Sequence, residues 1–248
     1  MRLDDPAPHS AGHPAQTRTS VLVTGFGPFP GVPVNATMRL VPELVQAARH
    51  ALPGVRVASA ILATEWAAAP LRLDALLADT EPDLVLHFGV SSRARGFEVE
   101  TRAGNACVLL PDASGCLPPA AELHVGNAAH LAVSLPVHHL VARLRRRRIP
   151  AFVSRDAGGY LCNALLYHSL LRVRQARGRR VGFIHIPASL ARPGGANRGR
   201  SGASPLSWDQ ALQGSLEILA ACLGRPLPLE GSMHLRLEHA TRKRLAPA

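Results

Sequence analysis

The segment from Ala151 to Leu170 constrains the fold of this chain most, because a strand pattern, a glycine turn and a helix pattern follow one another within it. Its first residues are apolar, a Gly-Gly pair favours a turn, and apolar residues then recur at spacings of three and four from Leu161 onward. Cys162 therefore lies in the first turn of a helix that follows a strand. Unpaired N–H groups and the positive end of the helix dipole favour a thiolate at such a position. A nucleophile is one interpretation of Cys162, and a small thiol that fills a packing gap is the other.

A thiol that attacks an acyl group needs a histidine base and a third group that orients this histidine. The apolar run from Val181 to Pro187 predicts a strand with His185 near its carboxyl end. Ligands of α/β proteins bind at the carboxyl ends of parallel strands, so we expect His185 and Cys162 at the same edge of the sheet. Glu98 and Glu100 are the candidate carboxylates, and the local pattern alone leaves both open.

Two other histidines are less suited to the role of base. His87 lies inside a predicted strand and is expected to be a core residue. His168 lies on the helix of Cys162, six residues further on, which turns it about 240° away from the thiol.

The whole pattern predicts an α/β protein of three layers, α/β/α, with a mostly parallel, twisted sheet. Strands and helices alternate, and residues 90–134 interrupt them as an active-site excursion or as short antiparallel strands. The expected strands are 21–25, 55–62, 83–89, 151–153 and 181–187. The expected helices are 37–49, 67–78, 137–148, a helix from 161 onward, and 205–222, the last of these capped by Ser204.

A chain of 248 residues with 47% apolar residues suits one domain, which we expect over residues 19–224. Residues 1–18 are polar and lack an apolar period, so they predict a disordered leader and no secretory signal. Residues 225–248 are expected to form a flexible basic tail. Without an apolar run of about 18 residues, no membrane span is predicted, and we expect a cytoplasmic protein.

The formal net charge of +11 raises the question of a nucleic-acid partner. All but one of the 28 basic residues are Arg, spread over the whole chain, and the densest run, 145–148, closes a predicted helix without interleaved aromatic residues. No nucleic-acid partner is therefore expected, although a basic interaction protein is the third interpretation of the chain. The four cysteines show no CxxC spacing, so we expect free thiols and no metal site.

Four blocks of the chain resemble the pyroglutamyl peptidase I family, also called pyrrolidone-carboxylate peptidases. These cysteine exopeptidases remove an N-terminal pyroglutamyl residue from peptides. The blocks are residues 21–29 with Asn35, 87–105, 154–170 and 182–187, and they occur in the family's order. The resemblance implies a phosphorylase/hydrolase-like fold and a thiol protease without a cofactor, whose partners are pyroglutamyl peptides. A homo-oligomer, a dimer or a tetramer, is the expected assembly.

The same resemblance implies roles for single residues. Cys162 would be the nucleophile, His185 the base and Glu100 the carboxylate that orients it, since Glu100 stands five residues before Asn105 as in the family. The lactam ring of the substrate would be held by Phe26, Phe29 and Asn35.

Two positions depart from the family pattern. Leu110 stands where many members carry an Arg that helps the oxyanion site, and Val90 stands where some carry a Gln. Loss of one oxyanion donor lowers rates by roughly 100- to 1000-fold. The alternative function is therefore a catalytically weak or inactive homologue that binds capped peptides or small lactams.

Overall fold

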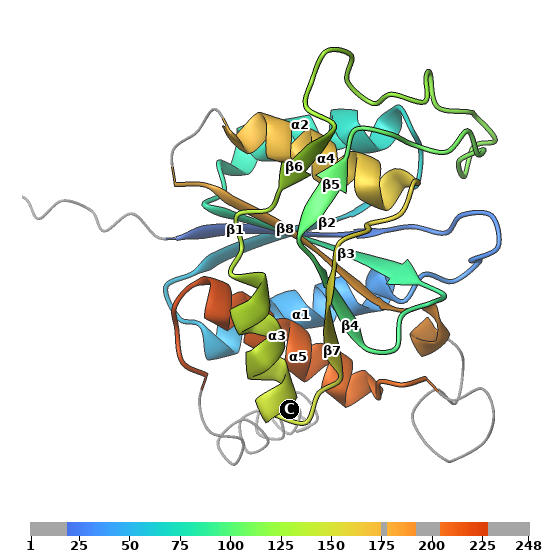
Figure 1. Ribbon diagram of the computed structural model, residues 1–248. Helices are drawn as coiled ribbons and strands as arrows, with labels where there is room; N and C mark the ends of the chain where they lie inside the picture. Colours follow the sequence, from blue (N-terminus) through green and yellow to red (C-terminus); the bar gives the residue numbers. More distant parts are fainter. Residues whose placement is uncertain (1–18, 175–177, 192–203, 228–248) are drawn as a thin grey trace, which may run out of the picture.

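The computed structural model describes residues 19–174, 178–191 and 204–227. The expected leader, residues 1–18, and nearly all of the expected tail lie outside these residues. The described part of the chain folds around one twisted sheet with helices on both of its faces (Figure 1). This arrangement confirms the predicted three-layer α/β/α class.

The central sheet has six strands in the order β2-β1-β3-β8-β4-β7. All neighbouring pairs are parallel except β8 and β4, which are antiparallel. The three strands β1, β3 and β8 are almost wholly buried, as expected when helices cover both faces of a parallel sheet. The bounds are β1 Ser20–Phe26, β2 Arg56–Leu62, β3 Leu84–Ser91, β4 Phe97–Glu100, β7 Ala151–Ser154 and β8 Arg180–Pro187.

Helices α2 and α4 cover one face of the sheet, and α1, α3 and α5 cover the other (Figure 1). Each face has its own apolar core. None of the helices in the described part of the chain has the length and apolar character that a bilayer span requires. The bounds are α1 Thr37–Ala51, α2 Ala68–Thr80, α3 Val137–Arg146, α4 Leu161–Arg174 and α5 Trp208–Cys222, with a short 3-10 helix at Ala188–Ala191.

The excursion at residues 90–134 contains the strand that the sequence pattern missed. β4 enters the central sheet between β8 and β7, two strands that come much later in the chain. Its four residues are too few for a periodic signal, and its partners are set by tertiary pairing. The excursion also holds the expected short antiparallel strands, β5 (Arg102–Gly104) and β6 (His130–Ala132).

Helix α5 begins at Trp208, three residues after the predicted start at Pro205. The reason is a capping box that lies further along the chain. The Ser207 hydroxyl accepts from the Gln210 N–H at 3.1 Å, and the Gln210 side chain accepts from the Ser207 N–H at 3.0 Å. This reciprocal pair satisfies two N–H groups of the first turn, so the cap is Ser207 and not Ser204.

Candidate active site

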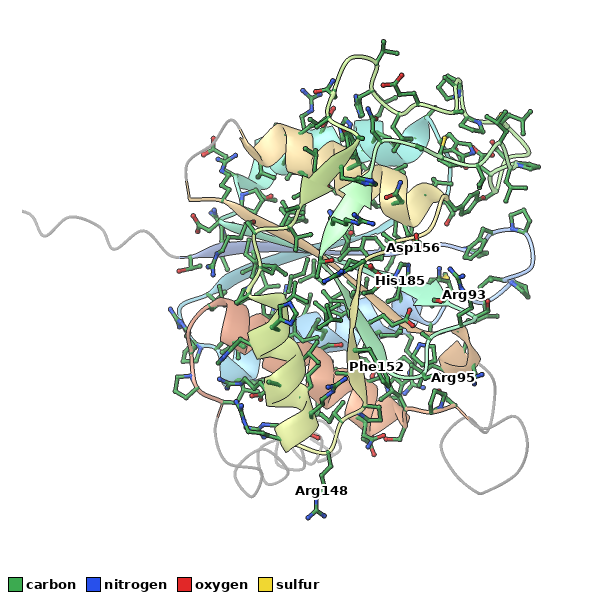
Figure 2. The ribbon with its side chains drawn as sticks, viewed as in Figure 1. Arg93, Arg95, Arg148, Phe152, Asp156 and His185 are labelled. Carbon is green, nitrogen blue, oxygen red and sulfur yellow. The ribbon has the colours of Figure 1, made fainter. Side chains whose placement is uncertain are left out.

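His185 lies near the carboxyl end of β8, and Figure 2 shows it between the two layers of helices. Its ring nitrogen Nδ1 lies 2.8 Å from Oε1 of Glu100, the last residue of β4. Both side chains are buried, and the second oxygen of Glu100, Oε2, has no hydrogen-bond partner among the described residues. A buried carboxylate stabilises the charged form of an imidazole beside it, so Nδ1 carries a proton and donates it to Glu100.

Cys162 is the second residue of α4, in the first turn as predicted from the apolar repeat, and its side chain lies near enough to His185 to act on the charge of the imidazole. Because Nδ1 of His185 faces Glu100, the ring nitrogen left for the sulfur is Nε2. Burial would lower the pKa of His185, but the charge and hydrogen bond of Cys162 and those of Glu100 outweigh it and raise this pKa to about 10. The imidazole is therefore held as a cation between a sulfur and a carboxylate. The fold thus brings Cys162 and His185 together from distant segments of the chain, as expected, and Glu100 lies next to His185.

Glu98 brings a second carboxylate to the same place. It lies directly opposite His185 in the antiparallel pairing of β4 with β8, and one ligand atom from each of Glu98, Glu100 and His185 falls within 4.8 Å of the others. Burial raises the pKa of Glu98 and the charge of Glu100 adds to this, while His185 and Arg93 act against it. Of the two candidate carboxylates, only Glu100 hydrogen-bonds the imidazole among the described contacts.

Two residues that the sequence reasoning did not assign shape this site. The ring of Phe183, also on β8, packs 4.8 Å from the ring of His185 between centroids. A Cβ placed on Gly89 of β3 would lie 2.8 Å from Phe183 and 3.0 Å from the sulfur of Cys162. Glycine at position 89 therefore leaves the space in which thiol, imidazole and aromatic ring meet. The only sequence signal for it is its place at the carboxyl end of a buried strand.

His87, predicted as a core residue, is fully buried on β3. The Ser169 hydroxyl donates to the carbonyl of Leu165, so it accepts from Nε2 of His87 at 2.8 Å, and Nδ1 of His87 accepts from the Thr24 hydroxyl at 2.6 Å. Burial, with a smaller contribution from the charge of His168, lowers the pKa of His87 to about 3. This histidine is neutral and ties β1 and β3 to α4.

His168 is paired elsewhere, as the helical geometry predicted. Its Nε2 lies 2.9 Å from a carboxylate oxygen of Asp74 on α2. It therefore belongs to the contact between α2 and α4 and not to the thiol.

The two predicted lactam residues Phe26 and Phe29 lie in different surroundings. Phe26 is not a loop residue, as the sequence pattern suggested, but the last residue of β1, 2% exposed and packed against Phe183. Phe29 is half-buried in the following loop and faces Tyr160, the residue before α4, with 5.8 Å between ring centroids. The Tyr160 ring in turn packs edge-on against Trp66 at 5.2 Å. A small aromatic surface thus lies next to the start of the Cys162 helix.

Asn35 is buried, and its amide is engaged within the protein. Its Nδ2 donates to the carbonyl of Gly27 at 3.1 Å, and its Oδ1 accepts from the Thr37 N–H at 3.1 Å and from the Thr37 hydroxyl at 2.8 Å. The Thr37 hydroxyl oxygen in turn accepts from the Phe26 N–H at 2.9 Å. Asn35 therefore fastens the loop that carries Phe29 to the start of α1.

The structure shows where Val90 and Leu110, the two departures from the family pattern, lie. Val90 is buried in β3, paired with Ile186 of β8, where it has no polar group to offer. Leu110 has an exposed side chain, and its carbonyl accepts from the indole N–H of Trp66 at 3.0 Å. Neither side chain supplies a hydrogen-bond donor.

Comparisons with known proteins identify relatives of this chain. The family model of pyroglutamyl peptidase matches residues 19–218. A pyrrolidone-carboxylate peptidase of Clavibacter michiganensis is 34% identical over 181 residues, 72% of this chain and 83% of that protein. One of Pyrococcus furiosus is 30% identical over 174 residues, 67% of this chain and 80% of that protein.

Solved structures show the same relation. A mutant pyrrolidone carboxyl peptidase of Pyrococcus furiosus has a TM-score of 0.72 at 26% identity, covering 83% of this chain and 99% of its own. The pyroglutamyl peptidase I of Bacillus amyloliquefaciens has a TM-score of 0.70 at 27% identity, covering 82% of this chain and 96% of its own. With a family model that spans most of the fold and relatives of this similarity, the chain belongs to the pyroglutamyl peptidase family of enzymes.

Proposed function

We propose that this enzyme is a cysteine exopeptidase that hydrolyses the amide bond after an N-terminal pyroglutamyl residue, using Cys162, His185 and Glu100. The observation that supports this most directly is the continuous array of sulfur, imidazole and carboxylate at the start of α4. Such an array has a nucleophile, a base that holds its proton, and a group that orients the base.

The first chemical step is acyl transfer to sulfur. The Cys162 thiolate attacks the pyroglutamyl carbonyl, the C–S bond forms, and the negative charge moves to the carbonyl oxygen. As the tetrahedral intermediate collapses, Nε2 of His185 gives its proton to the leaving amine and the C–N bond breaks. A raised pKa of His185 suits this step, because the proton is present over the whole neutral range.

The second step releases the acyl group. The neutral imidazole left after the first step takes a proton from water, and the resulting hydroxide attacks the thioester. Collapse of this second intermediate returns the electron pair to sulfur and frees pyroglutamic acid. Glu100 holds the ring with Nε2 toward the reacting atoms and stabilises the imidazolium each time it forms.

Phe26 and Phe29 would recognise the lactam, with Asn35 acting through the loop that it fastens. A five-membered lactam is neutral and flat, so it can lie on aromatic surface while its own N–H and C=O bind one or two partners. An open glutamyl residue would bring an ammonium and a carboxylate into this surface, and each unpaired buried charge costs at least several kcal/mol. The enzyme should therefore favour pyroglutamyl over glutamyl or glutaminyl amides by roughly a thousandfold or more.

Hydrolysis of a fluorogenic pyroglutamyl amide by the purified chain tests the proposal, with Cys162→Ala as the inactive partner and the glutaminyl amide as the control substrate. Turnover by the wild type that disappears in Cys162→Ala supports it. Saturable binding of the amide without turnover would instead support the alternative, a homologue that only binds capped peptides or lactams.

The proposal also covers the cellular compartment, the substrates and the assembly of the enzyme. All four cysteines are free thiols, which suits a reducing compartment such as the cytoplasm, and the partners would be peptides with an N-terminal pyroglutamyl residue. A dimer or tetramer remains the expected assembly, and size-exclusion chromatography with light scattering would measure it.

A further inference from the structure

A hollow of about 500 Å³ opens next to the start of α4, on surfaces that neither the catalytic array nor the aromatic residues use. Its wall includes Asn163, the residue after Cys162, and the turn at Gly158 and Gly159 that leads into α4. None of the residues proposed for the lactam lines it. Because Asn163 follows Cys162 in the chain, the hollow begins beside the residue that carries the thiol and leaves the lactam's space free.

The charged residues of the hollow give it an excess of positive charge. Arg102 of β5 and Arg155 of the loop before α4 both line it, and neither guanidinium has an ion-pair partner within the described residues. His130 of β6 adds a further group that can form hydrogen bonds. The one carboxylate of the wall, Asp156, already accepts from the Gly158 N–H at 2.9 Å and lies 4.0 Å from the guanidinium of Arg93.

The hollow is built from segments that hold one another in place. Nε of Arg102 donates to the carbonyl of Arg155 at 3.0 Å, which fixes the two arginine-bearing segments side by side. Elsewhere in the wall, the Val108 N–H donates to the carbonyl of Gly159 at 2.7 Å, and a Cβ on Gly159 would lie only 3.0 Å from the Val108 side chain. The shape therefore does not depend on long side chains alone.

Asn163 constrains the hollow in the same way. It binds the backbone of β5 through both ends of its amide, accepting from the Gly104 N–H at 2.8 Å and donating to the Gly104 carbonyl at 2.9 Å. Because Asn163 follows Cys162 directly, these bonds fix the hollow relative to the thiol. A ligand group that enters it is thus held at a set distance from the reacting sulfur.

We propose that this hollow binds a carboxylate of the leaving peptide and makes the enzyme selective for substrates with negative charge just beyond the scissile bond. The carboxylate would be the side chain of a Glu or Asp that follows the pyroglutamyl residue, or the free carboxyl terminus of a pyroglutamyl dipeptide. Arg102 and Arg155 are the specificity residues. The inference rests on the proposed peptidase activity and adds a preference for the residue on the leaving side of the scissile bond.

Two matched substrates test it: pyroglutamyl-glutamic acid α-amide and pyroglutamyl-glutamine α-amide, which differ in one charge and hardly in shape. We expect kcat/KM of the wild type to be about five- to tenfold higher for the glutamic acid amide at low ionic strength, as solvent-exposed ion pairs allow. The preference should shrink toward unity near 0.5 M salt, at which the screening length is about 4 Å. A second pair, pyroglutamyl-alanine and its amide, distinguishes a terminal carboxylate from a side-chain one.

Three variants locate the preference. Arg102→Gln with Arg155→Gln should bring the ratio of kcat/KM for the glutamic acid amide to kcat/KM for the glutamine amide close to one, because this ratio reports the guanidinium charges and not the absolute rate. Arg102→Lys with Arg155→Lys should keep part of the preference for the glutamic acid amide. Arg148→Gln is the control for the loss of a cation, since Arg148 is exposed and points away from the molecule at its lower edge, whereas His185 lies between the two layers of helices (Figure 2).

The outcomes separate the inference from the function on which it rests. Equal kcat/KM for charged and neutral partners in both substrate pairs would overturn the inference and leave the peptidase in place. A preference that survives in the double Gln variant would overturn the assignment to this hollow. If no pyroglutamyl substrate is cleaved, the proposed function fails and the inference with it. The wild-type ratio and its salt dependence decide the matter even if a variant folds poorly.

Discussion

Glu98 and His185 face each other across the antiparallel pair of β4 and β8, which brings a second carboxylate within reach of the imidazole. Glu100, two residues on and therefore on the same face of β4, makes the hydrogen bond to Nδ1. Two acidic side chains thus lie beside the histidine that contacts the thiol. The pH dependence of the enzyme should follow from this arrangement.

Glu100→Gln keeps the size of the side chain but removes its charge, so we expect kcat to fall by at least about 100-fold. Acylation requires the protonated imidazole, and the raised pKa of His185 predicts that kcat/KM declines only as the pH approaches about 10. Without the charge of Glu100 the pKa of His185 drops, so the decline should move to lower pH. Glu98→Gln, which leaves the hydrogen bond intact, should shift the profile less. Equal effects of the two changes would show that Glu100 has no special role.

The four thiols should differ sharply in their reaction with iodoacetamide near neutral pH. Burial raises the pKa of Cys222 to about 12 and raises the pKa of Cys107, so both should stay unlabelled in the folded enzyme. Cys116 is exposed, so the reagent can reach it, and it should be labelled more slowly than Cys162. Cys162 should react fastest, because it lies at the start of a helix and next to the cationic imidazole of His185.

Mass spectrometry of peptides measures how much of each cysteine is labelled. Cys116→Ser removes the other thiol that iodoacetamide can reach. His185→Ala should slow the labelling of Cys162 toward the rate of Cys116. If Cys162 in the wild type labels no faster than Cys116, the thiolate assignment is wrong.

Gly89→Ala should damage the site without touching a reacting atom. The added methyl group would overlap Phe183 and press on the sulfur of Cys162, so the thiol has to move. We expect a loss of stability of about 1–3 kcal/mol from overpacking and a fall in kcat/KM of about 100-fold from displacement of the nucleophile. Urea denaturation separates the two effects. Wild-type turnover by a folded Gly89→Ala protein would contradict the close packing of thiol and ring.

The buried His87 predicts an acid sensitivity of the fold. Its pKa is about 3 in the folded chain and near 6.5 in the unfolded chain, so between these values only the unfolded chain binds the proton. Stability is therefore complete above pH 6.5 and is lost as the pH falls, by up to about 1.4 kcal/mol per pH unit from this group. His185, with a raised pKa, is charged in both states over this range and does not oppose the trend.

Urea unfolding of the wild type and of His87→Gln at pH 7, 6 and 5 measures this contribution. Gln can donate to Ser169 and accept from Thr24 but does not titrate. The variant should be less stable at pH 7 and should lose less stability on acidification. An identical pH slope in both proteins would rule out His87 as the cause.

Phe26→Ala and Phe29→Ala should separate stability from substrate binding. Phe26 is a core side chain, so its loss should lower the free energy of unfolding by about 3–5 kcal/mol as well as raise KM. Phe29 is half-buried, so its replacement should destabilise less and act mainly on KM for the pyroglutamyl amide. An unchanged KM in a folded Phe29→Ala protein would remove Phe29 from the proposed lactam site.

The sequence predicted the residues whose signals are local. Cys162 follows from a strand, a glycine turn and an apolar helical repeat, and Gly158 indeed has a φ of 81° in that turn. His185 follows from its place at the end of an apolar run. Glu100 does not follow from such a pattern, because its pairing with His185 depends on two strands that run in opposite directions, with 85 residues of sequence between the two side chains.

Other differences have similar physical causes. The start of α5 was predicted from Ser204 and Pro205, whereas two reciprocal hydrogen bonds make Ser207 the cap. Phe26 was taken for a loop residue because Pro-rich sequence comes after it, but parallel pairing with β2 continues to the Phe26 position itself. In both cases the end of the helix or strand is set by hydrogen bonds to a side chain or to a neighbouring strand. The spacing of apolar residues in the sequence does not reveal such bonds.

The position of β4 between β8 and β7 sets the moment at which activity can arise during synthesis. Residues 97–100 leave the ribosome early, but both of their sheet neighbours lie beyond residue 150, and His185 is among the last residues of the sheet to be made. A nascent chain that stops short of β8 has Cys162 on a helix and Glu100 on a strand that lacks one of its two neighbours, and it does not yet contain His185. Emergence of β8 therefore completes the sheet and brings the imidazole of His185 next to the thiol in one event, before α5 has been made to cover its face of the sheet.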